Sequence, residues 1–115
     1  MIHSEAELQE CIANCRECGT VCSETVRHCL DAGGELASAA VVTRLLDCVD
    51  TCFTSAKFMA RRSELHPRAC GLCAEACTRC AEACERFPDD EVMRRCAEIC
   101  RRCAESCQRM ASMAA

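Results

Sequence analysis

Small and apolar residues recur along the chain at alternating spacings of four and three, which is the spacing of one face of an α-helix. The clearest case is the pattern C-x3-C-x2-C-x3-C, which begins at Cys11, at Cys73 and at Cys96. Seven residues make nearly two helical turns, so side chains at this spacing return to the same face. Each repeat therefore predicts a helix that carries one row of thiols.

The ends of the first two helices follow from the residues beside these rows. Ser4 and Glu7 have the spacing of a capping box, and Gly33 begins a Gly-Gly pair that would stop a helix. These signals predict a first helix over about residues 4–32. The four-three spacing then resumes and predicts a second helix over about residues 36–62.

Two prolines mark the remaining turns. Pro67 suits the first turn of a helix over about residues 67–87, and Asp89 is the predicted N-cap of a helix over about residues 89–112. Four helices joined by short turns predict a single domain over residues 1–115. We expect an all-α fold, an antiparallel up-down-up-down four-helix bundle with a cysteine-lined core.

The outer faces of the helices carry charged residues four positions apart. This spacing predicts ion pairs within single helices that are exposed to solvent. The predicted pairs are Glu75/Arg79, Glu82/Arg86, Glu98/Arg102 and Glu105/Arg109.

The second helix also has an apolar row beside its inward face. Val42, Leu46, Val49 and Phe53 are offset by one position from that face, so the apolar arc is wider than one bundle seam requires. Two interpretations stay open: an interface between copies of the chain, or packing against the flanks of neighbouring helices.

Composition and charge exclude several classes of function. The net charge is −4 and the chain has neither Trp nor Tyr, so nucleic acid is not an expected partner. No segment approaches the ~20 apolar residues of a membrane span, and residues 1–7 lack the basic start and apolar run of a signal peptide. We therefore expect a cytoplasmic protein, in which thiols are kept reduced.

The sixteen cysteines have three possible roles. Cysteine could replace Ala or Val as a small core residue, but Leu, Ile and Val would fill a bundle better and would not oxidise. Disulfides between helices are a second possibility, although the chain has four Gly and two Pro and does not resemble a loop-rich disulfide scaffold. Rows of reduced thiols favour the third role, which is metal binding.

Ligand softness and charge select among the metals. Thiolates prefer Cu(I), Zn(II) or iron–sulfur clusters. Each Zn(II) bound by four thiolates would leave a charge of −2 in the core, whereas each Cu(I) cancels one thiolate. The run from Cys70 to Cys84 superficially resembles ferredoxin cysteines, but it keeps helical spacing where ferredoxin ligands lie on a loop. Cu(I), at about one ion per cysteine, fits best.

The repeated C-x3-C pairs on helices that span the whole chain resemble the four-helix-bundle copper storage proteins, in particular the cytosolic members. The resemblance implies reversible storage of many Cu(I) ions in a preformed bundle, usually within a homotetramer, with copper donor and acceptor proteins as possible partners. It also implies that every cysteine is a ligand: Cys11, Cys15, Cys18, Cys22, Cys29, Cys48, Cys52, Cys70, Cys73, Cys77, Cys80, Cys84, Cys96, Cys100, Cys103 and Cys107.

One departure from that pattern lies in the second helix. It supplies only Cys48 and Cys52, and Val41 and Leu45 stand where further ligands could have stood. We expect a hydrophobic plug at that end of the bundle. Cys29 lies outside the C-x3-C pairs, as does Cys70, and both are expected to bridge to other helices.

The antiparallel layout gathers soft neutral ligands at the other end. The residues are His3, Met59, His66, Met110 and Met113. Thioether and imidazole bind Cu(I) without losing a proton at neutral pH, so we predict a copper entrance there. The alternative is that the methionines fill the core and the histidines lie on the surface.

No arrangement of nucleophile, base and orienting group is evident in the sequence, so we do not expect an enzyme. The alternative function is an iron–sulfur or thiol redox protein in electron transfer. A disulfide-stapled structural bundle is the third class.

Overall fold

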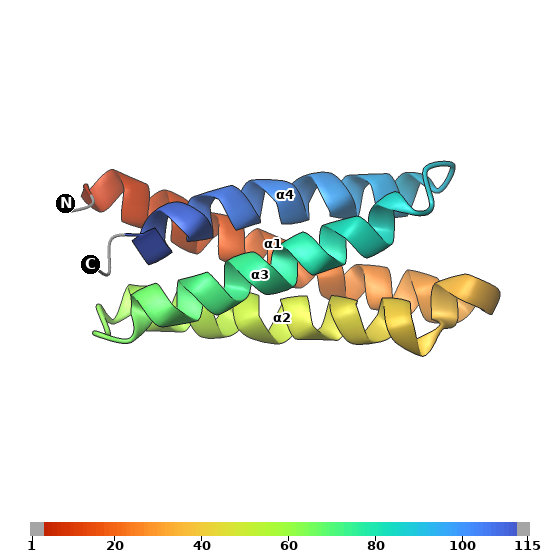
Figure 1. The fold of residues 1–115 in the computed structure, drawn as a ribbon, viewed down its shortest axis with the longest axis horizontal. Helices are drawn as coiled ribbons and strands as arrows, with labels where there is room; N and C mark the ends of the chain where they lie inside the picture. The colour runs from red at the N-terminus through yellow and green to blue at the C-terminus, as the bar shows by residue number, and fades with distance from the viewer. Residues whose placement is uncertain (1–3, 113–115) are drawn as a thin grey trace.

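The computed structural model describes residues 4–112, which form an elongated bundle of about 45 × 19 × 19 Å (Figure 1). Within this part of the chain there are four α-helices, one short 3-10 helix and no strand. The predicted all-α four-helix bundle is thus confirmed. The elements are α1 (Glu5–Ala32), η1 (Gly34–Ala37), α2 (Ala39–Ala60), α3 (His66–Glu85) and α4 (Glu91–Ala111).

The helices are antiparallel to their sequence neighbours and form a ring. Helix α1 packs against α2 and α4, and α3 packs against the same two helices. The backbones of the diagonal pairs, α1 with α3 and α2 with α4, stay apart in the described region. The start of α1 and the end of α4 therefore lie at one end of the bundle, beside the turn that joins α2 to α3 (Figure 1).

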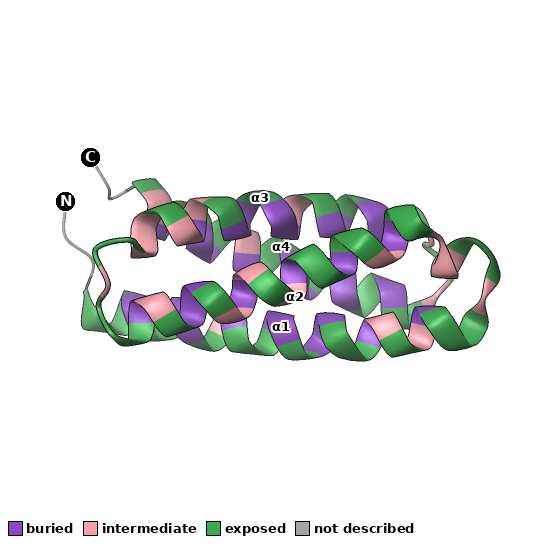
Figure 2. Cartoon of the chain, turned by 90° about the horizontal axis from the view of Figure 1, so that it is seen from below, coloured by how far each residue is buried: buried purple, intermediate pink, exposed green. Residues whose placement is uncertain are grey.

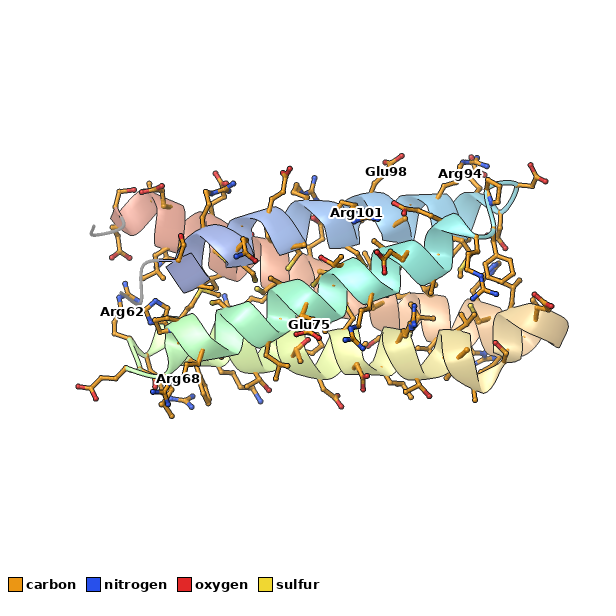
Figure 3. All side chains as sticks on the ribbon, viewed as in Figure 1. Arg62, Arg68, Glu75, Arg94, Glu98 and Arg101 are labelled. Carbon is orange, nitrogen blue, oxygen red and sulfur yellow. The ribbon has the colours of Figure 1, made fainter. Side chains whose placement is uncertain are left out.

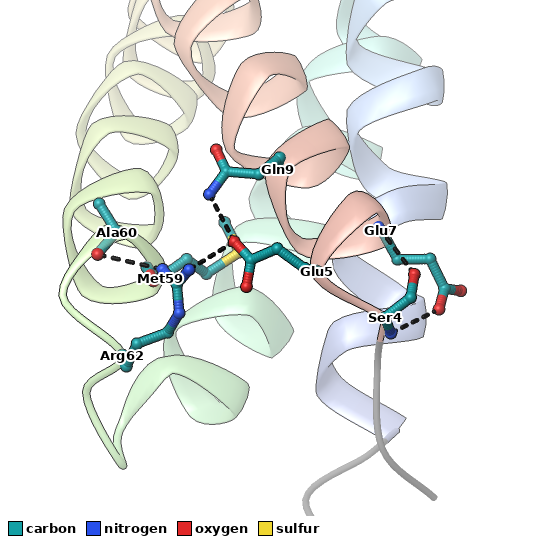
Figure 4. A network of polar contacts seen from close by, with 7 residues as sticks. All are labelled: Ser4, Glu5, Glu7, Gln9, Met59, Ala60 and Arg62. Atoms are coloured by element: carbon teal, nitrogen blue, oxygen red, sulfur yellow. Dashed lines mark hydrogen bonds and ion pairs between the residues drawn. The ribbon is translucent and has the colours of Figure 1, made fainter.

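The boundaries of α1 follow the sequence signals. The Ser4 hydroxyl accepts a hydrogen bond from the Glu7 N–H, and the Glu7 carboxylate accepts one from the Ser4 N–H (Figure 4). At the other end Gly33 has a φ of +73°, a conformation that glycine adopts without steric cost. Both the predicted capping box and the predicted stop are present.

Helix α2 is shorter than predicted at both ends. It begins at Ala39, not near residue 36, because residues 34–37 form η1 and the Ser38 hydroxyl accepts from the Val41 N–H as the N-cap. It ends at Ala60 because Arg62 turns the chain with a φ of +56°. The backbone N–H of Arg62 donates to the Met59 carbonyl oxygen, and that of Ser63 donates to the Phe58 carbonyl oxygen. This pair of hydrogen bonds is the Schellman motif.

The N-cap prediction for α4 was wrong by one residue. The N-cap is Asp90, which has extended backbone angles and whose carboxylate accepts a hydrogen bond from the Met93 N–H at 3.1 Å. The cause is the turn after Phe87, whose carbonyl accepts from the Asp90 N–H and so places Asp90 at the start of the helix. Pro67 lies in the first turn of α3, as predicted.

Buried residues line the inside of the bundle along its whole length (Figure 2). Cysteine supplies about half of these core side chains, and Val41, Leu45, Met59, Met93 and Met110 fill the two ends. A core with few large side chains leaves the helices close enough for thiols from different helices to meet.

Among the arginine ion pairs of the described residues, four join different helices or their ends, and two, Arg27–Asp31 and Glu75–Arg79, lie within one helix. Figure 3 shows charged side chains such as Arg68, Arg94 and Glu98 on the outside of the bundle. Glu75–Arg79 forms within α3 as predicted, but Arg102 pairs with Glu17 of α1 instead of Glu98. Three more ion pairs join helices or their ends: Arg101–Glu85, Arg109–Glu10 and Arg62–Glu5. Glu82/Arg86 and Glu105/Arg109 are not among the pairs found in the described residues.

The second apolar row of α2 is divided between packing and exposure. Phe53 lies against Gly19 of α1, and Val49 packs against the core. Leu46 remains 46% exposed. The row therefore serves flank packing in part, and its exposed portion is a separate apolar surface.

None of the four helices is both long and apolar enough to cross a bilayer, in the part of the chain that was searched.

Candidate metal centre

All sixteen cysteine side chains are completely buried, and none forms a disulfide. They come from all four helices because the four-three spacing turns each row toward the bundle axis. The shortest contact between two thiols, Cys15 to Cys107, is 3.4 Å, far longer than the ~2.05 Å of a disulfide bond. The core is thus lined by free thiols.

Thiols from different helices meet at the middle of the bundle. The Cys48 Sγ atom of α2 lies 3.5 Å from Cys77 of α3 and 3.7 Å from Cys18 of α1. It also lies 4.0 Å from Cys100 of α4. One sulfur atom of α2 therefore contacts a thiol on each of the other helices.

Thiols one helical turn apart are also close. The Sγ–Sγ distances of Cys18/Cys22, Cys48/Cys52, Cys73/Cys77 and Cys103/Cys107 lie between 3.8 and 4.0 Å. Two thiolates on one metal ion with bonds near 2.3 Å need sulfur atoms at most ~4.6 Å apart. These C-x3-C pairs therefore have the separation that a shared ion requires.

The thiols form groups of four whose sulfur atoms all lie within 4.8 Å of one another. Five of these groups each draw their members from three helices, and neighbouring groups share members. Such sharing joins twelve cysteines into one continuous array. Cys11 and Cys70 extend it beside Cys107, and Cys84 extends it beside Cys80 and Cys96. We call these fifteen thiols the thiol column, which leaves out Cys29. The groups include Cys15/Cys73/Cys103/Cys107, Cys18/Cys22/Cys48/Cys100, Cys18/Cys48/Cys52/Cys77, Cys22/Cys80/Cys96/Cys100 and Cys52/Cys73/Cys77/Cys103.

The two cysteines outside the C-x3-C pairs have different neighbours. Cys70 lies near Cys11 and Cys107, at the end where α1 begins. Cys29 lies near the other end, and its Sγ donates to the thioether sulfur of Met93 at 3.6 Å. Each therefore has sulfur on another helix as its neighbour, and for Cys29 that sulfur belongs to a methionine that was not predicted as a ligand.

Hydrogen bonds from neighbouring thiols lower the pKa of Cys11, Cys18, Cys48, Cys73, Cys96 and Cys103, but burial acts to raise the pKa of every thiol in the core. Burial is the main cause that raises the pKa of Cys29 to about 11, and the negative charge of Asp90 raises it further. The pKa of Cys84 is raised because its hydrogen bonds to Cys80 and Cys96 favour the protonated thiol, and burial adds to this. Neutral thiols are tolerated in an apolar core, so the bundle can form before any ion is bound.

The chain matches one protein family along nearly its whole length. Residues 4–112 match the family described as copper storage protein. The chain belongs to the copper storage protein family. A search of curated proteins finds no match.

Three solved structures, two of them described as copper storage proteins, have the same bundle. A crystal structure of a Nitrosospira multiformis protein shares 38% identity over 96% of this chain and 99% of its own, with a TM-score of 0.90. The Cu(I)-bound copper storage protein BsCsp3 shares 28% identity over 91% and 98%, with a TM-score of 0.85. Ccsp from Streptomyces lividans, loaded with 10 copper equivalents, shares 25% over 93% and 85%, with a TM-score of 0.80.

The predicted entrance residues that the structure describes lie together at one end. Met59 and Met110 are fully buried beneath that end, and His66 is half-buried with its Nδ1 atom 3.0 Å from the Ser63 carbonyl oxygen. His3 and Met113 lie outside the described residues. The two methionines thus sit inside the core beyond the last thiols rather than on an open surface.

Arg62 fixes the turn above Met59. Its guanidinium donates to the carbonyl oxygens of Met59 and Ala60 and to the Glu5 carboxylate, which also accepts from Gln9 (Figure 4). The end of α2 is thereby joined to the start of α1, directly over the buried thioether.

The contact between Met93 and Cys29 was not predicted from the sequence. Met93 precedes Cys96 by three residues and so continues the four-three row of α4. That spacing was the signal that could have identified it as a core sulfur.

Proposed function

We propose that this protein stores Cu(I) in the cytoplasm, at about one ion per cysteine, and that it has no catalytic activity. The observation that carries the proposal is the thiol column, whose four-thiol groups share members along the core. Membership of the copper storage family supports it. The similar structures of BsCsp3, described as Cu(I)-bound, and of Ccsp, described as copper-loaded, support it further.

The charge of the core favours Cu(I) over Zn(II). Among the described residues the buried polar side chains are Thr25, Ser55 and Ser106, and none of these carries a charge. Zinc centres with four thiolates each would leave −2 per ion without a buried cation to offset it. One Cu(I) per thiolate leaves the core neutral, and the shared members suit thiolates that bridge two ions.

No feature of the described bundle favours the iron–sulfur alternative. Cluster ligands usually come from a loop that wraps one cluster, whereas the thiols here lie on helices and continue for the length of the core. The alternative also predicts a brown protein with visible absorption, which Cu(I) thiolates lack.

The first experiment is an anaerobic Cu(I) titration of the fully reduced protein, with thiols counted and retained metal measured after gel filtration. We expect saturation near one Cu(I) per cysteine, and the same helical circular dichroism before and after loading because the bundle is preformed. Saturation at a few equivalents would instead indicate discrete sites, and brown protein with bound iron would indicate the redox alternative.

For copper transfer we propose the end that contains Met59, Met110 and His66, together with His3 and Met113 of the sequence. Stopped-flow loading and removal by a Cu(I) chelator test this assignment. Replacing Met59 and Met110 with Leu should slow both rates at unchanged capacity, because leucine keeps the volume and lacks the thioether. Unchanged rates in that variant, compared with the wild type, would reject the entrance.

We further propose that the protein assembles into a homotetramer through exposed apolar surface on α2 and α3. Leu46 of α2 and Leu72 of α3 are 46% and 60% exposed, respectively, and such side chains are typical of protein contacts. Sedimentation equilibrium of the wild type and of Leu72→Glu measures the assembly. A monomeric wild type would reject it.

A further inference from the structure

The row of thiols in α1 is interrupted before its last member. Cys11, Cys15, Cys18 and Cys22 are followed at the same spacing by Thr25 and then by Cys29. Thr25 is buried, and its hydroxyl donates to the Val21 carbonyl oxygen at 2.7 Å, so it offers no sulfur at this level. Cys29 thus stands one step beyond the thiols of its own helix.

The sulfur partner of Cys29 is of a different kind from those in the thiol column. Column thiols contact one another, whereas the Cys29 Sγ atom contacts the Met93 Sδ atom at 3.6 Å. Both side chains are completely buried. A thiol on α1 and a thioether on α4 therefore face each other inside the core, at the end where α2 begins.

A thiolate and a thioether together suit one Cu(I) ion. Both are soft ligands, and the single negative charge of the thiolate cancels the charge of Cu(I) without any bridging. Bonds near 2.3 Å need sulfur atoms at most ~4.6 Å apart, a limit that the 3.6 Å separation meets, and a linear geometry would need the two atoms to move apart toward that limit. The three rotatable bonds of methionine allow that movement without displacement of the backbone.

The two ligands are held in place by one carboxylate. Asp90 Oδ1 accepts the hydrogen bond from the Met93 N–H, and Asp90 Oδ2 lies 2.8 Å from the Nε2 atom of His28, the residue before Cys29. This contact joins the end of α1 to the start of α4. Val41 and Leu45, both fully buried, close the core at the same end.

We propose that Cys29 and Met93 form a separate, neutral Cu(I) site at the end of the bundle opposite the predicted entrance. The site rests on the proposed storage function but differs from the thiol column in its mixed thiolate–thioether ligands. Its ion does not share a thiolate with a neighbour, so its occupancy should be separable from that of the column.

Selenium X-ray absorption of selenomethionine-labelled, Cu(I)-loaded protein tests the site directly. We expect a copper neighbour at bond distance from selenium, and we expect that signal to fall in labelled Met93→Leu. Ile99→Leu is the matched control, since it makes an equally conservative change on α4 away from the sulfur pair, and it should keep the signal.

Titration gives a second measurement. Cys29→Ser should lose about one Cu(I) per chain, and Met93→Leu should bind that one ion more weakly while the others are unaffected. Circular dichroism verifies that each variant folds. Full copper loading of the wild type without a Met93-dependent selenium–copper signal would overturn this site and leave the storage function intact. Negligible loading of the wild type would overturn the storage function and the site with it.

Discussion

The ring of Phe53 on α2 lies directly over the backbone of Gly19 on α1. A Cβ atom at Gly19 would be 2.8 Å from the Phe53 Cζ atom, closer than real contacts allow. Glycine at this position therefore permits the close approach of α1 and α2, which in turn brings Cys18 and Cys48 within 3.7 Å of each other.

Replacing Gly19 with Ala should destabilise the bundle. The ring would have to leave its position, and overpacking of this kind costs about 1–3 kcal/mol in the free energy of unfolding. Gly71→Ala is the matched control, because its Cβ would have its nearest contact at an ordinary 3.6 Å from Ala111 and alanine favours a helix by up to ~1 kcal/mol. Urea unfolding of the reduced protein measures both. Equal stabilities of the two variants would contradict this account of Gly19.

Replacing Cys48 with Ser should remove about one Cu(I) per chain, because it removes one thiolate charge from the middle of the column. Ser55→Ala is the control: Ser55 lies buried on the same helix, but its hydroxyl donates to the Ala69 carbonyl oxygen, and its loss should reduce stability by about 1 kcal/mol without changing copper capacity. Anaerobic titration and thermal unfolding separate the two effects. A Cys48→Ser protein with full capacity would show that this thiolate is dispensable.

The partner of Arg102 can be measured by double-mutant cycles. The structure pairs it with Glu17 of α1, and both side chains are about half exposed, so we expect a coupling energy of about 0.2–1 kcal/mol that decreases with salt. The cycle with Glu98, one turn away on the same helix, should give a coupling near zero. A larger coupling energy to Glu98 than to Glu17 would contradict the pair seen in the structure and favour the pair predicted from the sequence.

Asp90→Ala should destabilise the protein by about 1 kcal/mol at neutral pH because α4 loses its N-cap. Asp89→Ala should have little effect, since its side chain does not cap the helix. Burial acts to raise the pKa of Asp90, but hydrogen bonds from His28 and Met93 lower it, and the net pKa lies below its usual value.

The pH dependence of this contribution follows from that sign. A carboxylate with a lowered pKa stabilises the folded state above the unfolded pKa of 3.8, and the stabilisation is lost as the pH falls through the lower pKa of the folded protein. The difference in unfolding free energy between wild type and Asp90→Ala should therefore shrink in strong acid. If the difference in unfolding free energy stayed constant until Asp90 was fully protonated, the lowered pKa of Asp90 would be contradicted.

The sequence predicted the helices and the inward thiols because both depend on local spacing. Cys18 and Cys22 lie on one face of any regular helix, and four such rows have one common interior to fill. It could not predict which charged residues would pair across helices. Arg102 reaches both Glu98 and Glu17 in principle, and the rotation of α4 against α1, set by core packing, decides between them.

Boundaries were predicted less well where side chains compete for the same turn. Asp89 and Asp90 are both good N-caps, and the hydrogen bond from the Asp90 N–H to Phe87 selects the second. Met93 shows a similar limit: its spacing placed it in the core, but only the packing of α1 against α4 shows that it faces Cys29.

The complete burial of the thiols also constrains the order of events during storage. The helices surround the column over a bundle about 45 Å long, so copper that enters at the proposed transfer end would reach the middle of the core only along the column. Such a store would load and release its ions in sequence through that one end. The copper taken up first would be the last released. The most recently bound ions would be the ones available for immediate use.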